Sequence, residues 1–142
     1  MKVFVSYAFT GEDFDTLRQR LSGLRDLFGE MGLDYYINTF ASDWQAMMDR
    51  GATGGEFLDF ALEDMKTSDL VLVLNSSERR SEGMLMEIGA AVAMNKKILL
   101  AQHQSSIGKT YTNTVADETF VWSSESELLE KVRQVIQKIN HA

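Results

Sequence analysis

The sequence at residues 70–91 is LVLVLNSSERRSEGMLMEIGAA. Its first five residues, 70–74, are all apolar, which is typical of a short strand buried on both faces of a sheet. A polar stretch follows, and Ser81 is a favoured residue for the N-cap of a helix. A buried strand that leads through a polar loop into a helix indicates an α/β fold.

The same alternation runs through the whole chain. Apolar segments rich in β-branched or aromatic residues predict strands at 3–7, 33–37, 70–74, 97–101 and, more weakly, 119–122. Apolar residues at helical spacing predict helices over 14–31, 58–65, 85–92 and 128–139. We therefore predict a three-layer α/β domain, flavodoxin-like or Rossmann-like, with a five-stranded parallel sheet and with residues 1–142 forming a single domain.

Two helical segments carry further information. In the first, apolar residues from Phe14 to Met31 alternate spacings of three and four, and Gly32 is a suitable C-terminal stop. In the third, the apolar face is predicted to contain Leu85, Ile88 and Val92. The stretch 39–55 is the hardest to interpret, and its mixture of tryptophan, methionine and glycine predicts a short helix followed by a mobile flap.

Composition excludes several classes of function. The chain has 142 residues, no cysteine and two histidines, so we expect neither disulfides nor a metal site, and no cofactor. A net charge of -7 disfavours a large nucleic-acid interface, because such interfaces depend on Lys and Arg. The short apolar start resembles no signal peptide, and no later segment is long enough to span a membrane, so we expect a cytoplasmic protein without a membrane partner.

Candidate site residues lie where the predicted strands end. In parallel α/β sheets, ligands bind outside the carboxyl ends of the strands. The candidate substrate-binding residues in these loops and in the first turn of the third helix are Ser6, Tyr7, Phe9, Asn75, Ser81 and Gly83. Glu87 lies four residues after Gly83, on a helix face with little side-chain bulk, and is the candidate catalytic group.

Each of these residues also has a simpler interpretation. Small residues on a helix face commonly mean close packing against a sheet, and a single glutamate beside them is commonly exposed to solvent. Tyr7 and Phe9 are equally suited to plain packing at the end of a strand. The polar Asn75 fits the end of any strand, because strand ends are commonly polar.

Residues 69–99 resemble the nucleoside 2-deoxyribosyltransferase family, which includes the 2'-deoxynucleoside 5'-phosphate N-hydrolase. The resemblance rests on the apolar strand after Asp69 and on the pattern Ser81-x-Gly83-x-x-x-Glu87-Ile88-Gly89-x-Ala91-x-Ala93-x-Asn95-Lys96-Lys97-Ile98. It implies a nucleoside or nucleotide substrate and cleavage or transfer at its N-glycosidic bond. It also implies that Glu87 is the nucleophile that attacks the anomeric carbon.

The resemblance carries three further expectations. The serine at position 81 is similar to that of the nucleotide hydrolase, which implies a phosphorylated ligand near the start of the helix. A second active-site acid of the family aligns with Ala61, so the group that would protonate the leaving base has no clear match, although Asp59, Glu63 and Asp64 are near. Because a loop of a neighbouring subunit completes the site in the family, the resemblance implies a homodimer.

A second resemblance is to Toll/interleukin-receptor (TIR) domains. It rests on the segment 3–7 followed by Gly11-Glu12-Asp13, and on the spacing from Ser81 to Glu87. It implies an NAD hydrolase that uses the same glutamate, or a non-catalytic module that binds a nucleotide or a signalling partner. Gly83 departs from the aromatic residue usual in that class, and the continuation after Glu87 is more similar to the deoxyribosyltransferases.

Overall fold

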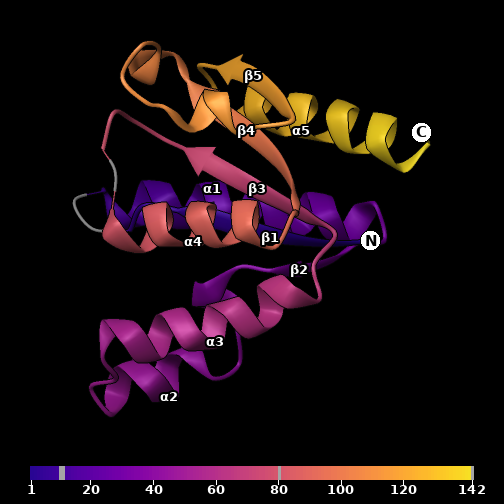
Figure 1. The fold of residues 1–142 in the computed structure, drawn as a ribbon. Coiled ribbons are helices and arrows are strands. Elements are labelled where there is room, and N and C mark those ends of the chain that lie inside the picture. The colour runs from indigo at the N-terminus through magenta and orange to yellow at the C-terminus, as the bar shows by residue number, and fades with distance from the viewer. Residues whose placement is uncertain (10–11, 80, 142) are drawn as a thin grey trace.

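The computed structural model describes residues 1–9, 12–79 and 81–141 and is built around a parallel sheet (Figure 1). Gly11, part of the TIR-like pattern, lies outside the described residues. The sheet has five strands in the order β2-β1-β3-β4-β5. Their bounds are β1 Lys2–Tyr7, β2 Asp34–Tyr36, β3 Leu70–Asn75, β4 Lys97–His103 and β5 Glu118–Trp122. This order is the flavodoxin-like one, and it confirms the predicted fold class, strand number and parallel arrangement.

Helices cover both faces of the sheet. The helices are α1 Phe14–Glu30, α2 Trp44–Asp49, α3 Gly54–Lys66, α4 Glu82–Ala93 and α5 Glu125–Asn140, and the 3-10 turns are η1 Asn38–Phe40, η2 Gln104–Ser106 and η3 Thr112–Thr114. Helices α1 and α5 pack on one face, while α3 and α4 pack on the other (Figure 1). None of the helices in the described part of the chain combines the length and the apolar content needed to cross a membrane.

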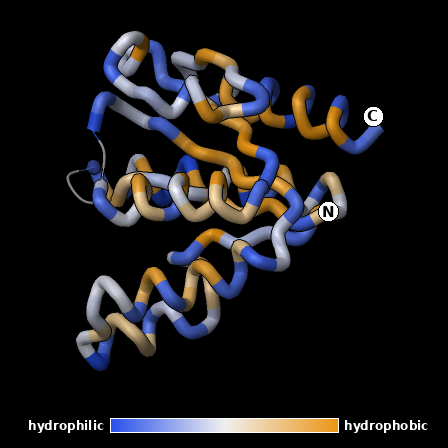
Figure 2. The backbone as a smooth tube through the Cα atoms, viewed as in Figure 1, coloured by the Kyte–Doolittle hydropathy of each residue, from blue (hydrophilic) through white to orange (hydrophobic). Residues whose placement is uncertain are grey.

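The central strand β3 shows why the sheet is buried on both faces. All six of its residues are buried, and it pairs with β1 on one side and β4 on the other. Leu70, Leu72 and Leu74 join the core under α1 and α5, whereas Val71 and Val73 join the core under α3 and α4. The hydrophobic stretch through the middle of the molecule in Figure 2 is this strand and its neighbours.

The predicted apolar face of α4 is wrong in two of its three positions. Ile88 is buried, but Leu85 and Val92 are 46% and 49% exposed, and the residues that pack inward are Met84, Ile88 and Ala91. Apolar residues occur around nearly the whole circumference of this helix, so periodicity could not select the buried side. Ala91 is completely buried in the core that α4 shares with α3 and the sheet, so the inward side of the helix is the one that carries this small residue.

The stretch 39–55 contains the predicted short helix, which is α2. The flap predicted after it is wrong for Gly54 and Gly55, because these glycines form the first turn of α3. The helix starts there because the Thr53 hydroxyl accepts a hydrogen bond from the Glu56 backbone N–H at 3.2 Å, while the Glu56 carboxylate accepts one from the Thr53 N–H at 3.2 Å. This capping box orders the glycines in spite of their low helix propensity.

Candidate active site

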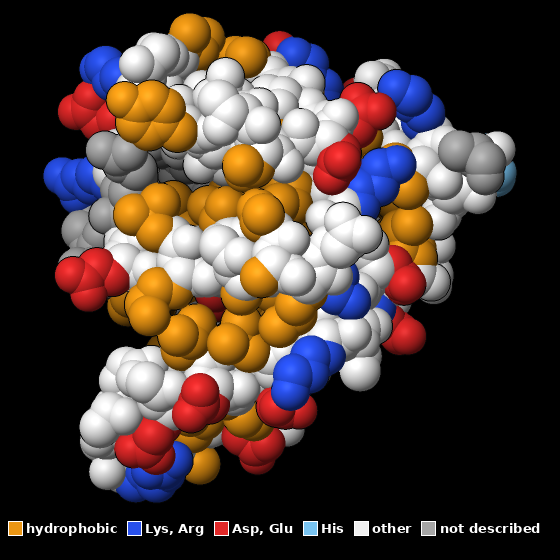
Figure 3. Space-filling model, in the orientation of Figure 1, with side chains coloured by type: hydrophobic (Ala, Val, Ile, Leu, Met, Phe, Trp, Pro, Cys, Tyr) orange, Lys and Arg blue, Asp and Glu red, His pale blue; other side chains and the backbone are white. Residues whose placement is uncertain are grey.

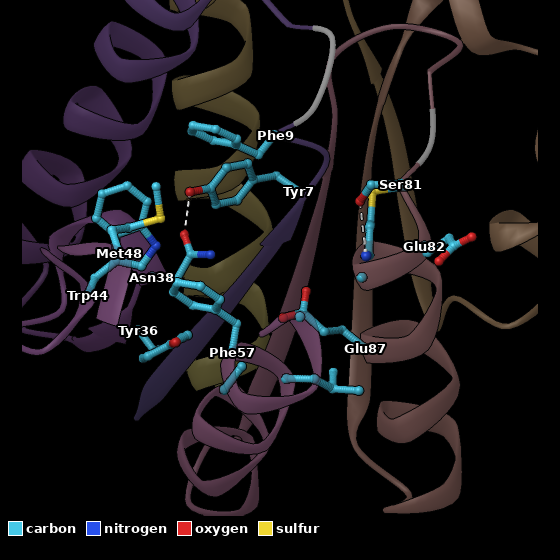
Figure 4. Close-up of a pocket in the computed structure, with 15 residues that line it drawn as sticks. Tyr7, Phe9, Tyr36, Asn38, Trp44, Met48, Phe57, Ser81, Glu82 and Glu87 are labelled. Carbon is cyan, nitrogen blue, oxygen red and sulfur yellow. Dashed lines mark hydrogen bonds between the residues drawn. The ribbon is translucent and has the colours of Figure 1, made fainter. Parts of the chain in front are cut away.

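A cavity of about 630 Å³ opens at the carboxyl end of β1, between α3 and α4 (Figure 4). After β1 the chain adds β2 on one side of it, and then β3, β4 and β5 in turn on the other side. The strand order therefore reverses between β1 and β3, and such a switch point is where α/β sheets bind ligands. The residues that line the cavity are Tyr7, Phe9, Tyr36, Asn38, Trp44, Met48, Gly54, Phe57, Leu58, Ala61, Ser81, Glu82, Gly83, Met84 and Glu87. The volume suits a ligand of nucleotide size.

Glu87 is the carboxyl group that faces this space from the second turn of α4 (Figure 4). Burial raises the pKa of Glu87 to about 7, and a hydrogen bond from Ser6 opposes part of that rise. The Ser6 hydroxyl donates to Glu87 Oε1 at 2.8 Å, and its side chain is completely buried at the end of β1. Ser6 therefore holds one carboxylate oxygen in place while the rest of the group faces the cavity.

Tyr7 and Asn38 form a hydrogen-bonded pair on the opposite wall. The Tyr7 hydroxyl donates to Asn38 Oδ1 and lies 3.4 Å from the Thr39 hydroxyl. Burial raises the pKa of Tyr7 to about 12, with a smaller contribution from the nearby Glu87 carboxylate. The phenol therefore keeps its proton at neutral pH and remains a hydrogen-bond donor.

Aromatic and apolar side chains form the outer part of the cavity. Phe9 and Trp44 have ring centroids 6.4 Å apart, and Met48 and Phe57 lie beside them in the lining (Figure 4). Phe9 is 40% exposed, so its ring is accessible from the solvent. Such a wall offers stacking area to a planar ring and few polar groups that would distinguish one ring from another.

The first turn of α4 closes the cavity on its other side. The Ser81 hydroxyl accepts a hydrogen bond from the Met84 backbone N–H at 3.1 Å, which makes Ser81 the N-cap of the helix. A Cβ added at Gly83 would meet nothing within 4 Å, so a ligand can approach the backbone there. The N-terminal end of a helix, with its backbone N–H groups and the positive end of its dipole, is suitable for an anion.

The structure brings most of the predicted site residues together. Tyr7, Phe9, Ser81, Gly83 and Glu87 all line the cavity, and Ser6 reaches it through its bond to Glu87. Asn75 lies apart from them. Its side chain is buried at the end of β3, it does not line the cavity, and its Oδ1 has no hydrogen-bond partner in the described part of the chain.

Several lining residues were not predicted. Tyr36 and Asn38 come at the end of β2, and the rule that ligands bind at the carboxyl ends of strands points to them once β2 is known to lie next to β1. Trp44 and Met48 lie four residues apart on α2, in the stretch that was hardest to interpret. A spacing of four residues predicts that two side chains lie on the same face of a helix, but it does not indicate that this face borders a ligand site.

The cavity has no acid at the position where the family carries its second active-site acid. Ala61 lines the cavity at the position that the family resemblance assigns to an acid. Asp64 instead pairs with Lys2 at 2.7 Å, and Glu63 pairs with Lys66 at 2.8 Å. Glu82 is the second carboxyl group in the lining, but Figure 4 shows it directed away from Glu87. Among the described lining residues, Glu87 is thus the single carboxylate aimed into the space.

Fold and site together define an α/β protein with one carboxylate of raised pKa in a ligand cavity at the switch point of its sheet. A model of the nucleoside 2-deoxyribosyltransferase family matches residues 9–121. The chain belongs to that family, as the first of the two resemblances predicted. Membership supports a function at the N-glycosidic bond of nucleoside-like substrates.

Solved structures show the same fold at low sequence identity. A CMP N-glycosidase from Clostridium botulinum is 24% identical, with a TM-score of 0.66 over 95% of this chain and 99% of the other. A 2-deoxyribosyltransferase from Bacillus psychrosaccharolyticus is 14% identical, with a TM-score of 0.57 over 94% of this chain and 90% of the other. A conserved protein from Enterococcus faecalis is 19% identical, with a TM-score of 0.55 over 94% and 98%. A search among curated proteins gave no match.

Proposed function

We propose that this protein hydrolyses the N-glycosidic bond of a nucleoside 5'-monophosphate, with Glu87 as the nucleophile. The observation that carries this proposal is the position of Glu87, a partly buried carboxylate that faces a nucleotide-sized cavity in a chain of this family. The bond breaks through a state in which the anomeric carbon carries positive charge, and a carboxylate beside it stabilises that charge.

The chemistry proceeds in two steps. A Glu87 oxygen forms a bond to the anomeric carbon as the carbon–nitrogen bond breaks, and the base leaves with the electron pair. Water then hydrolyses the glycosyl ester, which releases the sugar phosphate and restores the carboxylate. Ser6 holds Oε1, so the second oxygen, Oε2, is the free one for attack.

Three features support a phosphorylated substrate with its base among the aromatic residues. Ser81 caps α4 with its oxygen and retains a hydroxyl proton that can be donated to a phosphate oxygen. Gly83 leaves the helix N-terminus open to an anion. The similar fold of the CMP N-glycosidase adds an example of a nucleotide substrate in this architecture. Tyr7 and Phe9 would then border the base.

The test is a chromatographic assay for released base. Wild type and the Glu87→Gln variant are incubated with nucleosides, nucleoside 5'-monophosphates and NAD, each with and without a second free base. We expect release from monophosphates and a loss of about a thousandfold or more in the variant, as is usual when a nucleophile is removed. Glu130→Gln, on the exposed side of α5, is the matched control and should retain full activity.

The other outcomes distinguish the remaining candidates. Formation of a new nucleoside from the second base would make the protein a transferase, and release of nicotinamide from NAD would support the TIR-like interpretation. If wild type releases no base from any substrate, the proposal fails and a non-catalytic binding module remains.

A homodimer is part of the same proposal. Helix α4, which carries Glu87, exposes Leu85, Met86 and Val92 at 46%, 57% and 49%. Figure 3 shows hydrophobic side chains gathered across the centre of this face, over α4 and in the crease beside α3. Apolar surface that is contiguous with a ligand site favours contact with another chain, and the family resemblance supports a second copy as that chain.

A further inference from the structure

Departure of the base needs a stabilising group of its own. When the carbon–nitrogen bond breaks, the electron pair moves onto the base, and its ring nitrogen and the neighbouring acceptor atom gather negative charge. An acid or a hydrogen-bond donor on the base side of the cavity lowers the barrier to this step. Ala61 stands at the position of the family's acid, and Glu82, the other carboxyl group among the described lining residues, is directed away from Glu87, so a neutral donor must be considered.

Asn38 is such a donor. It follows β2 and lines the cavity on the wall across from Glu87 (Figure 4). A side-chain amide has one oxygen that accepts and one NH₂ group that donates. The oxygen already accepts from Tyr7, and no hydrogen bond from the Asn38 Nδ2 is found within residues 1–9, 12–79 and 81–141. Figure 4 shows the nitrogen on the side of the amide that faces Glu87.

Tyr7 fixes this orientation. Burial keeps the phenol protonated, and a phenol has a single proton to donate. In the structure that proton goes to Asn38 Oδ1, which places the amide oxygen on the Tyr7 side and the NH₂ group on the side that faces Glu87. The amide therefore presents N–H groups, rather than its oxygen, to a ligand in the cavity.

We propose that Asn38 is the leaving-group contact, and that its NH₂ group donates a hydrogen bond to the acceptor atom of the base adjacent to the glycosidic nitrogen. That atom is O2 in a pyrimidine and N3 in a purine. Tyr7 acts through Asn38 and is a positioning residue. The inference rests on the proposed N-glycosidic chemistry and adds to it the group that stabilises the departing base.

No proton is transferred by Asn38 in this step. The bond from Glu87 to the anomeric carbon forms as the carbon–nitrogen bond breaks, the electron pair stays on the base, and Asn38 keeps both of its hydrogens. The departing base takes a proton from water. Hydrolysis of the glycosyl ester by a second water molecule returns a proton to the solvent, so that the complete cycle neither consumes nor produces one.

The test compares leaving groups of different quality in single-turnover assays. The substrates are uridine 5'-monophosphate and its 2'-deoxy form, each beside its 5-fluoro analogue, whose base carries negative charge more easily. We expect Asn38→Ala to slow release of uracil about 10- to 100-fold, as for a lost hydrogen bond to a charged group, but to slow release of 5-fluorouracil less than about threefold. Tyr7→Phe should also slow release of uracil more than release of 5-fluorouracil, but by smaller factors than Asn38→Ala. Asn140→Ala, at an exposed position, should slow neither.

A purine arm identifies the acceptor atom. If adenosine 5'-monophosphate is also cleaved, its 3-deaza analogue, which lacks N3, should react with wild type as slowly as the natural substrate reacts with Asn38→Ala. If Asn38→Ala slows release of uracil and of 5-fluorouracil by the same factor, the inference is overturned, because the effect of a structural defect does not depend on the leaving group. Absence of release by wild type would instead overturn the proposed function, so the two failures are distinguishable.

Discussion

Glu87 combines a buried position with a chemical task that needs its charged form. Its pKa is raised to about 7, mainly by burial, and a carboxylic acid cannot attack an anomeric carbon until it has lost its proton. The rate of base release under single-turnover conditions should therefore rise about tenfold per pH unit below pH 7 and level off above it. The measurement is a pH–rate profile on the substrate that wild type cleaves fastest.

Ser6 provides the control for that profile. Its hydrogen bond to Oε1 favours the charged form of Glu87, so Ser6→Ala should move the inflection of the profile to higher pH. A variant with a lower rate and an unchanged inflection would show that Ser6 does not tune this carboxyl group. Ser6 was predicted from the sequence as a substrate-binding residue, and that role remains a prediction, since its buried hydroxyl reaches the cavity only through Glu87.

The same pKa shift makes a prediction about stability. A carboxyl group with a pKa of 4.5 in the unfolded chain and about 7 in the folded protein costs stability above pH 7, because folding then buries a charge. Glu87→Gln should therefore be more stable than wild type at pH 8, by roughly 1–3 kcal/mol. The difference should shrink as the pH falls from 7 and vanish below about 4.5. Urea unfolding of both proteins at pH 8 and below about pH 4.5 measures this stability difference. A gain of equal size at both pH values would mean that the charge of Glu87 is not the cause of the difference.

At the scale of elements, β3 and α4 were the most predictable part of the chain. A run of five apolar residues, a serine cap and a helix follow from local chemistry alone, and the structure has all of them in the predicted places. The buried face of α4 did not follow, because Leu85 and Val92 are as apolar as the residues that pack inward. Which side of such a helix meets the sheet is decided by tertiary packing, and a periodicity argument contains no information about it.

The start of α4 should serve both the fold and the substrate, and the start of α5 serves the fold alone. Ser81 and Ser124 cap their helices in the same way, with N–H to oxygen distances of 3.1 and 3.2 Å. Each serine-to-alanine variant should lose about 1 kcal/mol of unfolding free energy. Only Ser81→Ala should also raise the KM for a nucleoside 5'-monophosphate, by about tenfold, and it should leave the KM for the unphosphorylated nucleoside unchanged. A rise for both substrates would mean that the hydroxyl does not contact the phosphate.

At the scale of the whole molecule, the cavity is assembled from segments that the sequence keeps far apart. Glu87, Ser81 and Tyr7 were predicted because strand ends and helix starts converge at one edge of a parallel sheet. Asn38 and Trp44 join them because β2 lies next to β1, and that pairing is a long-range fact that neither residue's neighbours encode. Alternation of strands and helices thus predicted the architecture and five of the fifteen lining residues, whereas Asn38 and Trp44 required the strand order.

The association of two chains is the property of the whole molecule that remains to be measured. A homodimer that buries the exposed face of α4 should sediment at twice the 16.0 kDa of one chain. Replacing Leu85 and Val92 together by glutamate should yield monomers, because two charges cannot be buried unpaired at an interface, and base release should fall with the dimer. Ile107→Glu places a charge on a residue that is equally apolar and 57% exposed but remote in sequence, and should leave the dimer intact. If wild type sediments as a monomer and is active, a second chain is not needed to complete the site.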